Sequence, residues 1–290
     1  MIEISVALRE TAKTLANAGV DSFQAEAELL LAELLNTSRG GAQVAALTGK
    51  TLDEDQAEQL GIWVARRAAR EPLQHILGSA PFMDFEVAVG PGVFIPRPET
   101  EQVIAAAVHF KQMSAGSQPV RRALDLCAGS GVIALALART YPQAEVLAVE
   151  KETAALHWAK QNIDSLGGNR VHLMQADICE LTSAELGEPF DIIVSNPPYV
   201  PADCIPQQAE TAKHDPASAL YSGSDGLTLI RKLIPLAVTA AAPGCVIAIE
   251  HTEEQGAAVC ALLTAAGWLD AHTVNDLSGR PRASLGRLEL

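Results

Sequence analysis

The sequence predicts an α/β fold: a doubly wound, mainly parallel sheet with a terminal antiparallel hairpin, preceded by a small N-terminal helical domain. Three observations predict it. From about residue 99 onward, short strand-like apolar runs alternate with amphipathic helical stretches, a pattern typical of a parallel sheet covered on both faces. The first of these runs ends in a glycine-rich turn that opens a helix. Residues 1–78 show helical periodicity and no strand-like run.

Residues 1–78 are expected to form the helical domain, and two helix starts are visible in it. Asp21 is followed by Gln24 and Asp53 by Gln56, the spacing of a capping box, and apolar residues then recur at helical spacing. The polar faces of these helices hold no recognisable chemistry. We therefore expect this domain to recognise a partner, with a merely structural cap as the alternative.

Residues 79–98 are expected to form a β-hairpin linker. Phe82, Phe85 and Val87 are spaced for short strands, and Pro96 and Pro98 then separate these strands from the next helix. Pro98 suits the first position of a helix, where its missing N–H costs nothing. Residues 99–290 form the predicted α/β domain.

Seven apolar runs within 99–290 are expected as strands. The parallel strands are Ala123–Leu126, Val146–Val149, Val171–Met174, Ile192–Ser195 and Cys245–Glu250, and the hairpin strands are Trp268–Val274 and Ala283–Leu288. Parallel strands have their carboxyl ends at one edge, where open α/β sheets bind ligands. Site residues are therefore expected directly after strands.

Composition limits the possible functions. The chain has 290 residues and a formal net charge of −14, with 48% hydrophobic and 19% charged residues. This acidic balance argues against direct binding to nucleic acid, because affinity for phosphate backbones needs clustered Lys and Arg. The five cysteines are scattered without metal-ligand spacing, so we expect no metal site and a cytoplasmic location. Neither a secretory signal nor a membrane span is expected.

The stretch Ser195–Val200 follows a buried strand and holds the residues expected to bind substrate. Pro197 and Pro198 stop the strand and remove two backbone donors, so the Asn196 amide and the Pro197 carbonyl should be left as unpaired polar groups that face a cleft. Two fixed acceptors suit a planar NH2 group, which has two N–H donors, and Tyr199 could stack on it. The alternative is an ordinary turn, because Asn-Pro often begins a loop.

A second set of residues predicts a nucleoside site. The first strand ends in a glycine turn that lets a ligand approach the backbone, and Glu150 closes the second strand, where an acid can bind ribose hydroxyls. Asp177 follows the third strand, placed to accept a hydrogen bond from an adenine amino group. Asp125 and Asp177 could instead have local turn or capping roles, and such a glycine turn also fits NAD proteins. The turn residues are Asp125, Cys127, Ala128, Gly129, Ser130 and Gly131.

Together, the glycine turn, Glu150 and Asn-Pro-Pro-Tyr resemble class I S-adenosylmethionine-dependent methyltransferases, which have a Rossmann-like fold. Further stretches are similar to the peptide chain release factor glutamine N5-methyltransferases, the PrmC/HemK family, over nearly the whole chain. These stretches are Glu71–Gly78, Phe94–Glu101, Gly226-Leu227, Glu250-His251 and Asp276–Arg280. The resemblance implies transfer of a methyl group from S-adenosylmethionine to the glutamine side-chain amide in the Gly-Gly-Gln motif of class I release factors.

The resemblance also implies roles for individual residues. Cys127 to Gly131 would cradle the cofactor and Glu150 would hold its ribose, while Asn196, Pro197, Pro198 and Tyr199 would hold the glutamine. Three positions depart from the common family pattern: Cys127-Ala128 stand for Gly-Thr, Glu150 for Asp, and Ile178 for a Trp beside the adenine. His214-Asp215-Pro216 also replaces a more usual Glu-Pro.

The mechanism expected is direct in-line displacement, with Asn196, Pro197 and Tyr199 as the residues at the reacting nitrogen and Asn196 also close to the cofactor. Positioning and desolvation can supply most of the catalysis, because a sulfonium is already electrophilic. Two other functions use the same features. An N6-adenine nucleic-acid methyltransferase shares Asn-Pro-Pro-Tyr but needs a basic groove and base flipping, and a non-catalytic nucleoside-binding or assembly protein needs only the glycine turn.

Overall fold

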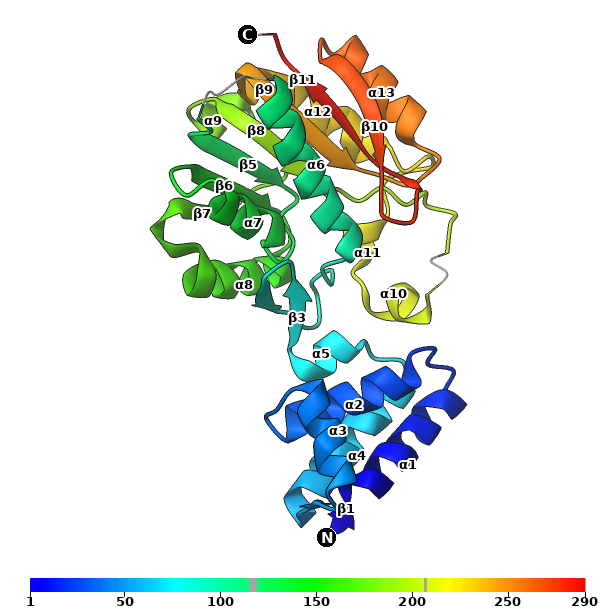
Figure 1. Ribbon diagram of the computed structural model, residues 1–290. Coiled ribbons are helices and arrows are strands. Elements are labelled where there is room, and N and C mark those ends of the chain that lie inside the picture. Colours follow the sequence, from blue (N-terminus) through cyan, green and yellow to red (C-terminus); the bar gives the residue numbers. More distant parts are fainter. Residues whose placement is uncertain (115–118, 206–207, 290) are drawn as a thin grey trace. The chain divides into compact units, whose positions relative to one another are not determined.

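The computed structural model describes residues 1–114, 119–205 and 208–289, and the chain packs as two compact units (Figure 1). The N-terminal unit holds Met1–Ser79 together with helix α10 (Ala209–His214). The sheet unit holds Ala80–Ile205 and Asp215–Leu290. The chain therefore leaves the sheet unit shortly after the Asn-Pro-Pro-Tyr stretch, adds one short helix to the N-terminal unit, and returns.

The N-terminal unit is built from helices around an apolar core that includes Leu15, Leu30 and Leu31, all fully buried. Its first five helices are α1 (Ile4–Asn17), α2 (Phe23–Leu34), α3 (Arg39–Leu47), α4 (Glu54–Ala68) and α5 (Leu73–Leu77). The prediction that this domain has no strand is wrong in one detail. Strand β1 (Ile2–Glu3) pairs antiparallel with β2 (Thr51–Leu52), and two residues are too few to leave a periodic pattern.

The two predicted helix starts differ in outcome. Asp53 and Gln56 form the predicted capping box at the start of α4, with the Asp53 carboxylate accepting from the Gln56 amide at 2.8 Å. The prediction for Asp21 is wrong. Helix α2 follows Ser22 without a side-chain cap, and the Ser22 hydroxyl instead donates to Glu26.

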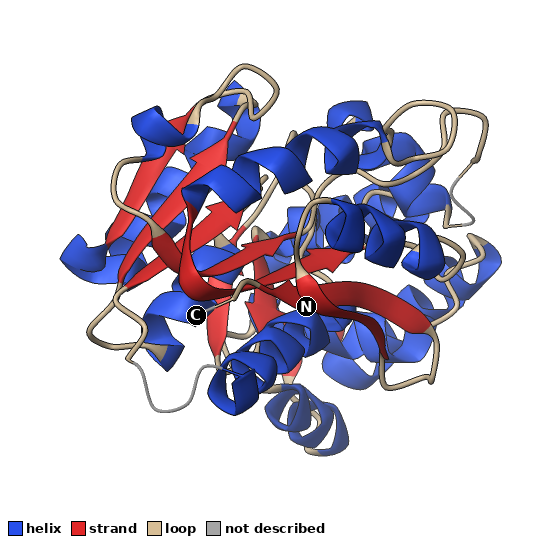
Figure 2. Cartoon of the chain, turned by 90° about the horizontal axis from the view of Figure 1, so that it is seen from above, coloured by secondary structure: helices blue, strands red, loops and turns tan. Residues whose placement is uncertain are grey.

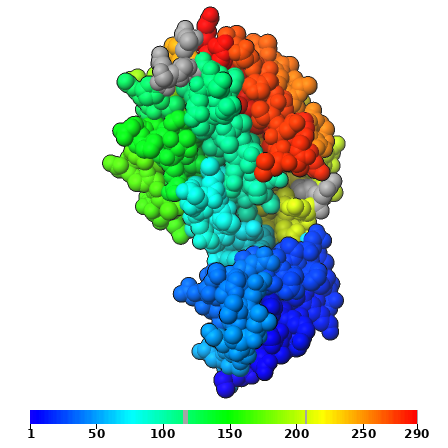
Figure 3. Space-filling view, in the orientation of Figure 1, coloured from blue at the N-terminus to red at the C-terminus, as the bar shows by residue number. Residues whose placement is uncertain are grey.

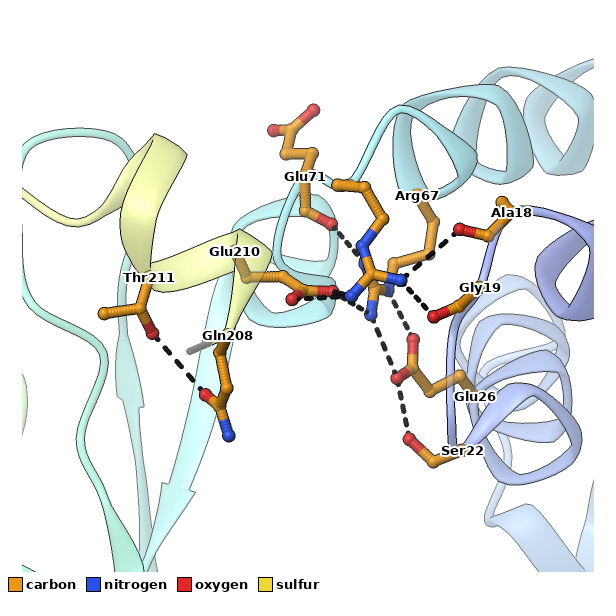
Figure 4. Close-up of polar contacts among 10 residues, drawn as sticks. Ala18, Gly19, Ser22, Glu26, Arg67, Glu71, Gln208, Glu210 and Thr211 are labelled. Atoms are coloured by element: carbon orange, nitrogen blue, oxygen red, sulfur yellow. Dashed lines mark hydrogen bonds and ion pairs between the residues drawn. The ribbon is translucent and has the colours of Figure 1, made fainter. Parts of the chain in front are cut away.

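Helix α10 is attached to the N-terminal unit by charged side chains (Figure 4). The Glu210 carboxylate lies 2.8 Å from an Arg67 nitrogen and 2.7 Å from an Arg70 nitrogen, and Arg67 also pairs with Glu26. Arg67 is almost completely buried, so its charge requires partners of opposite sign. Two guanidinium groups and two carboxylates thus balance one another inside this unit.

The sheet unit begins with the hairpin β3 (Ser79–Phe82) and β4 (Phe85–Ala88), followed by α6 (Pro98–Ser114), which starts at the proline as predicted. The remaining elements alternate as the sequence indicates. The strands are β5 (Arg122–Leu126), β6 (Glu145–Glu150), β7 (Val171–Gln175), β8 (Phe190–Ser195), β9 (Ala241–Glu250), β10 (Leu269–Asn275) and β11 (Pro281–Arg287). The helices are α7 (Val132–Thr140), α8 (Thr153–Asn162), α9 (Ser183–Leu186), α11 (Ala217–Leu220), α12 (Thr228–Ala240) and α13 (Gly256–Ala265), with a π turn (Ile163–Gly167) and a 3-10 turn (Gly168–Arg170) after α8.

The seven strands form one sheet in the order β10-β11-β9-β8-β5-β6-β7. The five from β9 to β7 are parallel and β11 runs antiparallel to β9. Strand β10 pairs antiparallel with β11, as expected for a terminal hairpin, which confirms the predicted fold class. Helices cover both faces of the sheet (Figure 2), with α6 and α7 packed on one apolar cluster and α12 and α13 on the other. Figure 3 shows the outer surfaces of α6 and the β10–β11 hairpin next to each other, and Phe110 meets His272 edge-on at 4.9 Å.

The strand order reverses between β5 and β8. The chain moves outward from β5 through β6 to β7 and then returns to place β8 on the other side of β5. Leu126 and Ser195 are register partners at the carboxyl ends of these two strands. Ligands of open α/β sheets bind at such a switch point, and here both the glycine turn and Asn196 follow it. Among the described residues, no helix is long and apolar enough to cross a membrane.

Candidate functional site

The glycine turn joins β5 to α7 through three residues with left-handed backbone. Cys127 has φ 66°, Gly129 φ 55° and Gly131 φ 83°, and a Cβ on Gly129 would meet no atom within 4 Å. The Ala128 amide donates to the Val149 carbonyl, which ties the turn to β6. Such a turn leaves backbone N–H groups and open space for a ligand.

Asp125 lies beneath this turn and is fully buried. Its carboxylate accepts from the Ala134 amide at 3.0 Å, in the first turn of α7, so it makes the capping contact that the sequence left open. Burial raises the pKa of the Asp125 carboxyl to about 8, and the neighbouring charge of Glu150 acts in the same direction. A direct contact with cofactor stays a prediction.

Glu150 at the end of β6 is the acid that faces the glycine turn. One of its oxygens accepts from the Gly129 amide at 2.7 Å, and the other accepts from the Lys151 and Glu152 amides, each at 2.8 Å. These three bonds fix the carboxylate at the carboxyl edge of the sheet. A carboxylate has about four acceptor positions, so capacity remains for a ribose hydroxyl.

Asp177 and Ile178 follow the third parallel strand. Asp177 accepts from the Cys179 amide at 2.9 Å and lies 2.8 Å from the Lys151 ammonium, and this hydrogen bond from Lys151 lowers the pKa of its carboxyl. Ile178 is buried in the apolar cluster under α12. Both local contacts are compatible with the predicted adenine site, which stays a prediction.

Asn196 leaves β8 as predicted, with Pro197 buried behind it. Its Nδ2 donates to the Thr100 hydroxyl at 3.2 Å, so this half of the amide is paired, contrary to the expectation of a wholly unpaired group. Among the residues that the structure describes, none donates to Asn196 Oδ1 or to the Pro197 carbonyl. The two acceptors required by a planar NH2 group are therefore available.

Tyr199 is held at both ends. Its hydroxyl donates to Glu250 at 3.0 Å, and its carbonyl accepts from Gln255 Nε2 at 2.9 Å. Glu250 is almost fully buried at the end of β9 and also accepts from the Thr100 hydroxyl at 2.7 Å. Burial raises the pKa of the Glu250 carboxyl to about 7, and burial with the Glu250 charge also raises the pKa of Tyr199.

Four residues at this site were missed from the sequence as site residues. Thr100 and Glu250 belong to stretches that carried the family resemblance, but nothing in their spacing predicted that they meet. Gln255 also donates to the Asp225 carbonyl, and Asn162 joins the Ser130 carbonyl of the glycine turn to Ala88 of β4. These roles become visible only in the folded structure, because they depend on hydrogen bonds between residues that are far apart in the sequence.

Solved structures share this fold. The T. thermophilus 16S rRNA N2 G1207 methyltransferase, solved with AdoMet and guanosine, matches with TM-score 0.51 and 21% identity over 73% of this chain and 50% of that one. The hMettl16 catalytic domain, solved with an MAT2A 3′UTR hairpin, matches with TM-score 0.53 and 14% identity over 84% and 85% of the two chains. Identities this low show the fold alone.

Sequence relatives identify the family. The PrmC N-terminal domain matches residues 6–78 and the methyltransferase small domain matches residues 88–213. The release factor glutamine methyltransferase of Streptomyces coelicolor is 43% identical over 97% of this chain and 96% of its own length. Those of Mycolicibacterium smegmatis and Geobacter sulfurreducens are 40% and 37% identical, over 97% and 94% of this chain and 96% and 93% of their own. The chain belongs to the release factor glutamine methyltransferase family.

Proposed function

We propose that this protein methylates the side-chain amide nitrogen of the glutamine in the Gly-Gly-Gln motif of class I release factors, with S-adenosylmethionine as methyl donor. The observation that carries the proposal is the pair of open acceptors, Asn196 Oδ1 and the Pro197 carbonyl, directly after the strand that neighbours the glycine turn. A primary amide presents two N–H donors to such a pair. The family relatives support the same substrate.

The residues present fit S-adenosylmethionine. The glycine turn offers open space above Gly129, and Glu150 is fixed beside it with remaining acceptor capacity for ribose hydroxyls. Asp177 and Ile178 follow the neighbouring strand, where the adenine is expected. We assign Cys127 to Gly131 to the cradle of the cofactor. When bound, S-adenosylmethionine supplies an electrophilic methyl group for in-line transfer to nitrogen.

The chain's own residues position the nucleophile. Asn196 Oδ1 and the Pro197 carbonyl each accept one N–H of the substrate amide, which fixes the plane of the amide and the direction of its nitrogen. Positive charge develops on that nitrogen as it is methylated, so both hydrogen bonds strengthen in the transition state. The substrate nitrogen gains the methyl group and loses one of its two protons. The oxygen that accepts from this N–H keeps the hydrogen bond until the proton passes to water. Tyr199 offers an aromatic face to the planar group and excludes water from it.

The N-terminal unit is the part we assign to recognition of the release factor. It has its own apolar core, and α3 exposes Val44 and Leu47 to solvent. Exposed apolar side chains favour contact with a protein over contact with a nucleoside. The cytoplasmic location and the absence of direct nucleic-acid binding stay predictions.

Mass spectrometry of a purified class I release factor, incubated with this protein and S-adenosylmethionine, tests the proposal. A gain of one methyl group on the motif glutamine is expected, and a release factor with Gln replaced by Ala at that position serves as the control. An adenine-containing oligonucleotide in a parallel reaction tests N6-adenine methylation. Methyl transfer to the oligonucleotide with none to the release factor would reject the proposal.

A further inference from the structure

A chain of hydrogen bonds runs from a buried carboxylate to the amide of Asn196. Thr100, in the first turn of α6, donates its hydroxyl proton to Glu250 Oε2 at 2.7 Å, and the same hydroxyl oxygen lies 3.2 Å from Asn196 Nδ2. Thr100 is 150 residues from Glu250 and 96 from Asn196 in the sequence. The fold alone brings these three groups together.

The direction of each hydrogen bond in this chain is determined by the carboxylate. Above its pKa of about 7 the Glu250 carboxylate is ionised and can only accept, so the single proton of the Thr100 hydroxyl points to Glu250, as the geometry has it. The Thr100 oxygen then has only lone pairs left for Asn196 and must receive an N–H. The Asn196 amide is therefore held with NH2 toward Thr100 and with Oδ1 on the opposite side, available to a substrate donor.

Burial keeps water from replacing any of the groups in this series of hydrogen bonds. Thr100 is 2% exposed and Glu250 is 1% exposed. The second oxygen of Glu250 accepts from the Tyr199 hydroxyl at 3.0 Å, so the same carboxylate fixes the other end of the Asn-Pro-Pro-Tyr stretch. Without this constraint, an amide can rotate by 180° and present NH2 where an acceptor is needed.

We propose that Glu250 and Thr100 are positioning residues that fix the orientation of the Asn196 amide, so that Oδ1 rather than Nδ2 faces the substrate glutamine. The inference rests on the proposed function, because it names what makes Asn196 an acceptor. Neither residue needs to touch substrate. Glu250 acts through Thr100, and Thr100 acts through Asn196.

We call the hydrogen bonds from Glu250 through Thr100 to Asn196 the relay. Two near-isosteric substitutions, Thr100→Val and Glu250→Gln, test its direction. Thr100→Val removes the hydroxyl and keeps the shape, whereas Thr100→Ser keeps the hydroxyl. Glu250→Gln keeps the volume but introduces an NH2, which can donate to Thr100 and reverse the direction of the bond to Asn196. We expect kcat on the release factor to fall about 10- to 100-fold in Thr100→Val and Glu250→Gln, with cofactor affinity nearly retained, and Thr100→Ser to recover most of the activity.

A matched control separates orientation from stability. Thr273 lies on β10 and its hydroxyl contacts Ser284 and Cys260, neither of which bonds to Thr100, Glu250 or Asn196 among the described residues. Thr273→Val removes the same group from a half-buried position, so it should change the melting temperature and leave kcat unaltered. A fall of kcat in Thr273→Val equal to that in Thr100→Val would show that the loss is not specific to the relay.

A double-mutant cycle with Asn196→Ala is the decisive measurement. If Thr100 acts only through Asn196, Thr100→Val should cause no further loss of kcat in the Asn196→Ala protein. An equal fold-loss in both backgrounds, or wild-type kcat in Thr100→Val, would overturn the relay. If Thr100→Val does not fold, Thr100→Ala tests the relay in its place, because it also removes the hydroxyl, and wild-type kcat in that protein overturns it. Absence of methylation by the wild-type protein would instead reject the proposed function.

Discussion

Gly226 leaves no room for a side chain beside Tyr199. A Cβ on Gly226 would lie 2.0 Å from the Tyr199 carbonyl oxygen and 2.5 Å from Gln255 Nε2, and its φ of +74° is also unfavourable for other residues. The Gly226 backbone thus lies directly against the end of the Asn-Pro-Pro-Tyr stretch. Gly226 and Gln255 together determine where the Tyr199 carbonyl lies.

Gly226→Ala is expected to displace Tyr199 and to lower turnover while cofactor affinity stays close to that of the wild type. The left-handed backbone alone should cost about 1–2 kcal/mol of stability, and the clash adds to that. Gly49→Ala is the matched control, because Gly49 has φ +68° and no atom near its Cβ position. Melting curves and turnover of both proteins check the prediction, and equal turnover in the two would contradict it.

Glu150→Ala should weaken the binding of S-adenosylmethionine by at most about 3 kcal/mol. Hydrogen bonds to a charged carboxylate are worth about 1.5–3 kcal/mol each, and water recovers part of the loss. Loss of the bond to the Gly129 amide also loosens the glycine turn. Calorimetric titration measures the effect, with Glu145→Ala, an exposed acid at the opposite end of β6, as the control. Wild-type affinity in Glu150→Ala would remove the ribose assignment.

Asp125 predicts a pH-dependent difference in stability. Its pKa is about 8 in the folded protein, well above the ordinary 3.8, because burial disfavours the charge. Such a group stabilises the folded state fully below its unfolded pKa, and this contribution is lost as pH rises through the folded pKa. Asp125→Asn, which can still cap α7, should therefore gain stability relative to the wild type between about pH 4 and pH 8. Urea unfolding across this range, without cofactor, checks it. A pH-independent difference would be inconsistent with the buried acid.

Glu210→Ala tests the attachment of α10 to the N-terminal unit. The substitution leaves Arg67 and Arg70 with Glu26 as the remaining carboxylate of the cluster, and breaking a buried pair costs about 3–5 kcal/mol. Hydrogen exchange should increase in α4 and α10. Asp270→Ala breaks the exposed pair with Arg287 and should cost about 1 kcal/mol or less. Unchanged exchange in α4 would argue against a structural role for Glu210.

The sheet could be predicted from the sequence because its evidence is local. Each parallel strand contains a short run of mainly apolar residues, and the predicted runs match the observed strands with small changes at their ends. The largest change is in β9, which begins at Ala241 instead of Cys245 and includes Pro243 and Gly244. The capping box at Asp53 and the helix start at Pro98 are local as well, and both are confirmed.

The parts that escaped prediction depend on distant partners. Glu210 joins Arg67 across 143 residues, and Thr100 joins Glu250 across 150. Neither pair has a periodic pattern or a fixed spacing, so only the completed fold shows which charge meets which. Asp125 differs in kind: the sequence placed it correctly at a strand end but could not decide between a cap and a cofactor contact.

Asn196 is the residue on which the proposed function depends most directly. Asn196→Ala should retain cofactor affinity and lose about a hundredfold or more in turnover, the usual effect of removing one preorganised hydrogen-bond partner. Asn196→Asp keeps an acceptor oxygen but cannot donate to Thr100, whose proton is directed to Glu250. The new carboxylate would then face the Thr100 oxygen without an N–H between them, close to the buried Glu250 charge, so the Asn196→Asp protein should also methylate poorly.

If the stretch were only a turn, both substitutions would lower the melting temperature, and activity would fall only in proportion to the unfolded fraction. Melting temperature, cofactor affinity and turnover measured on the same preparations separate these outcomes. A folded, cofactor-binding Asn196→Ala protein with near wild-type turnover would show that Asn196 is not the acceptor.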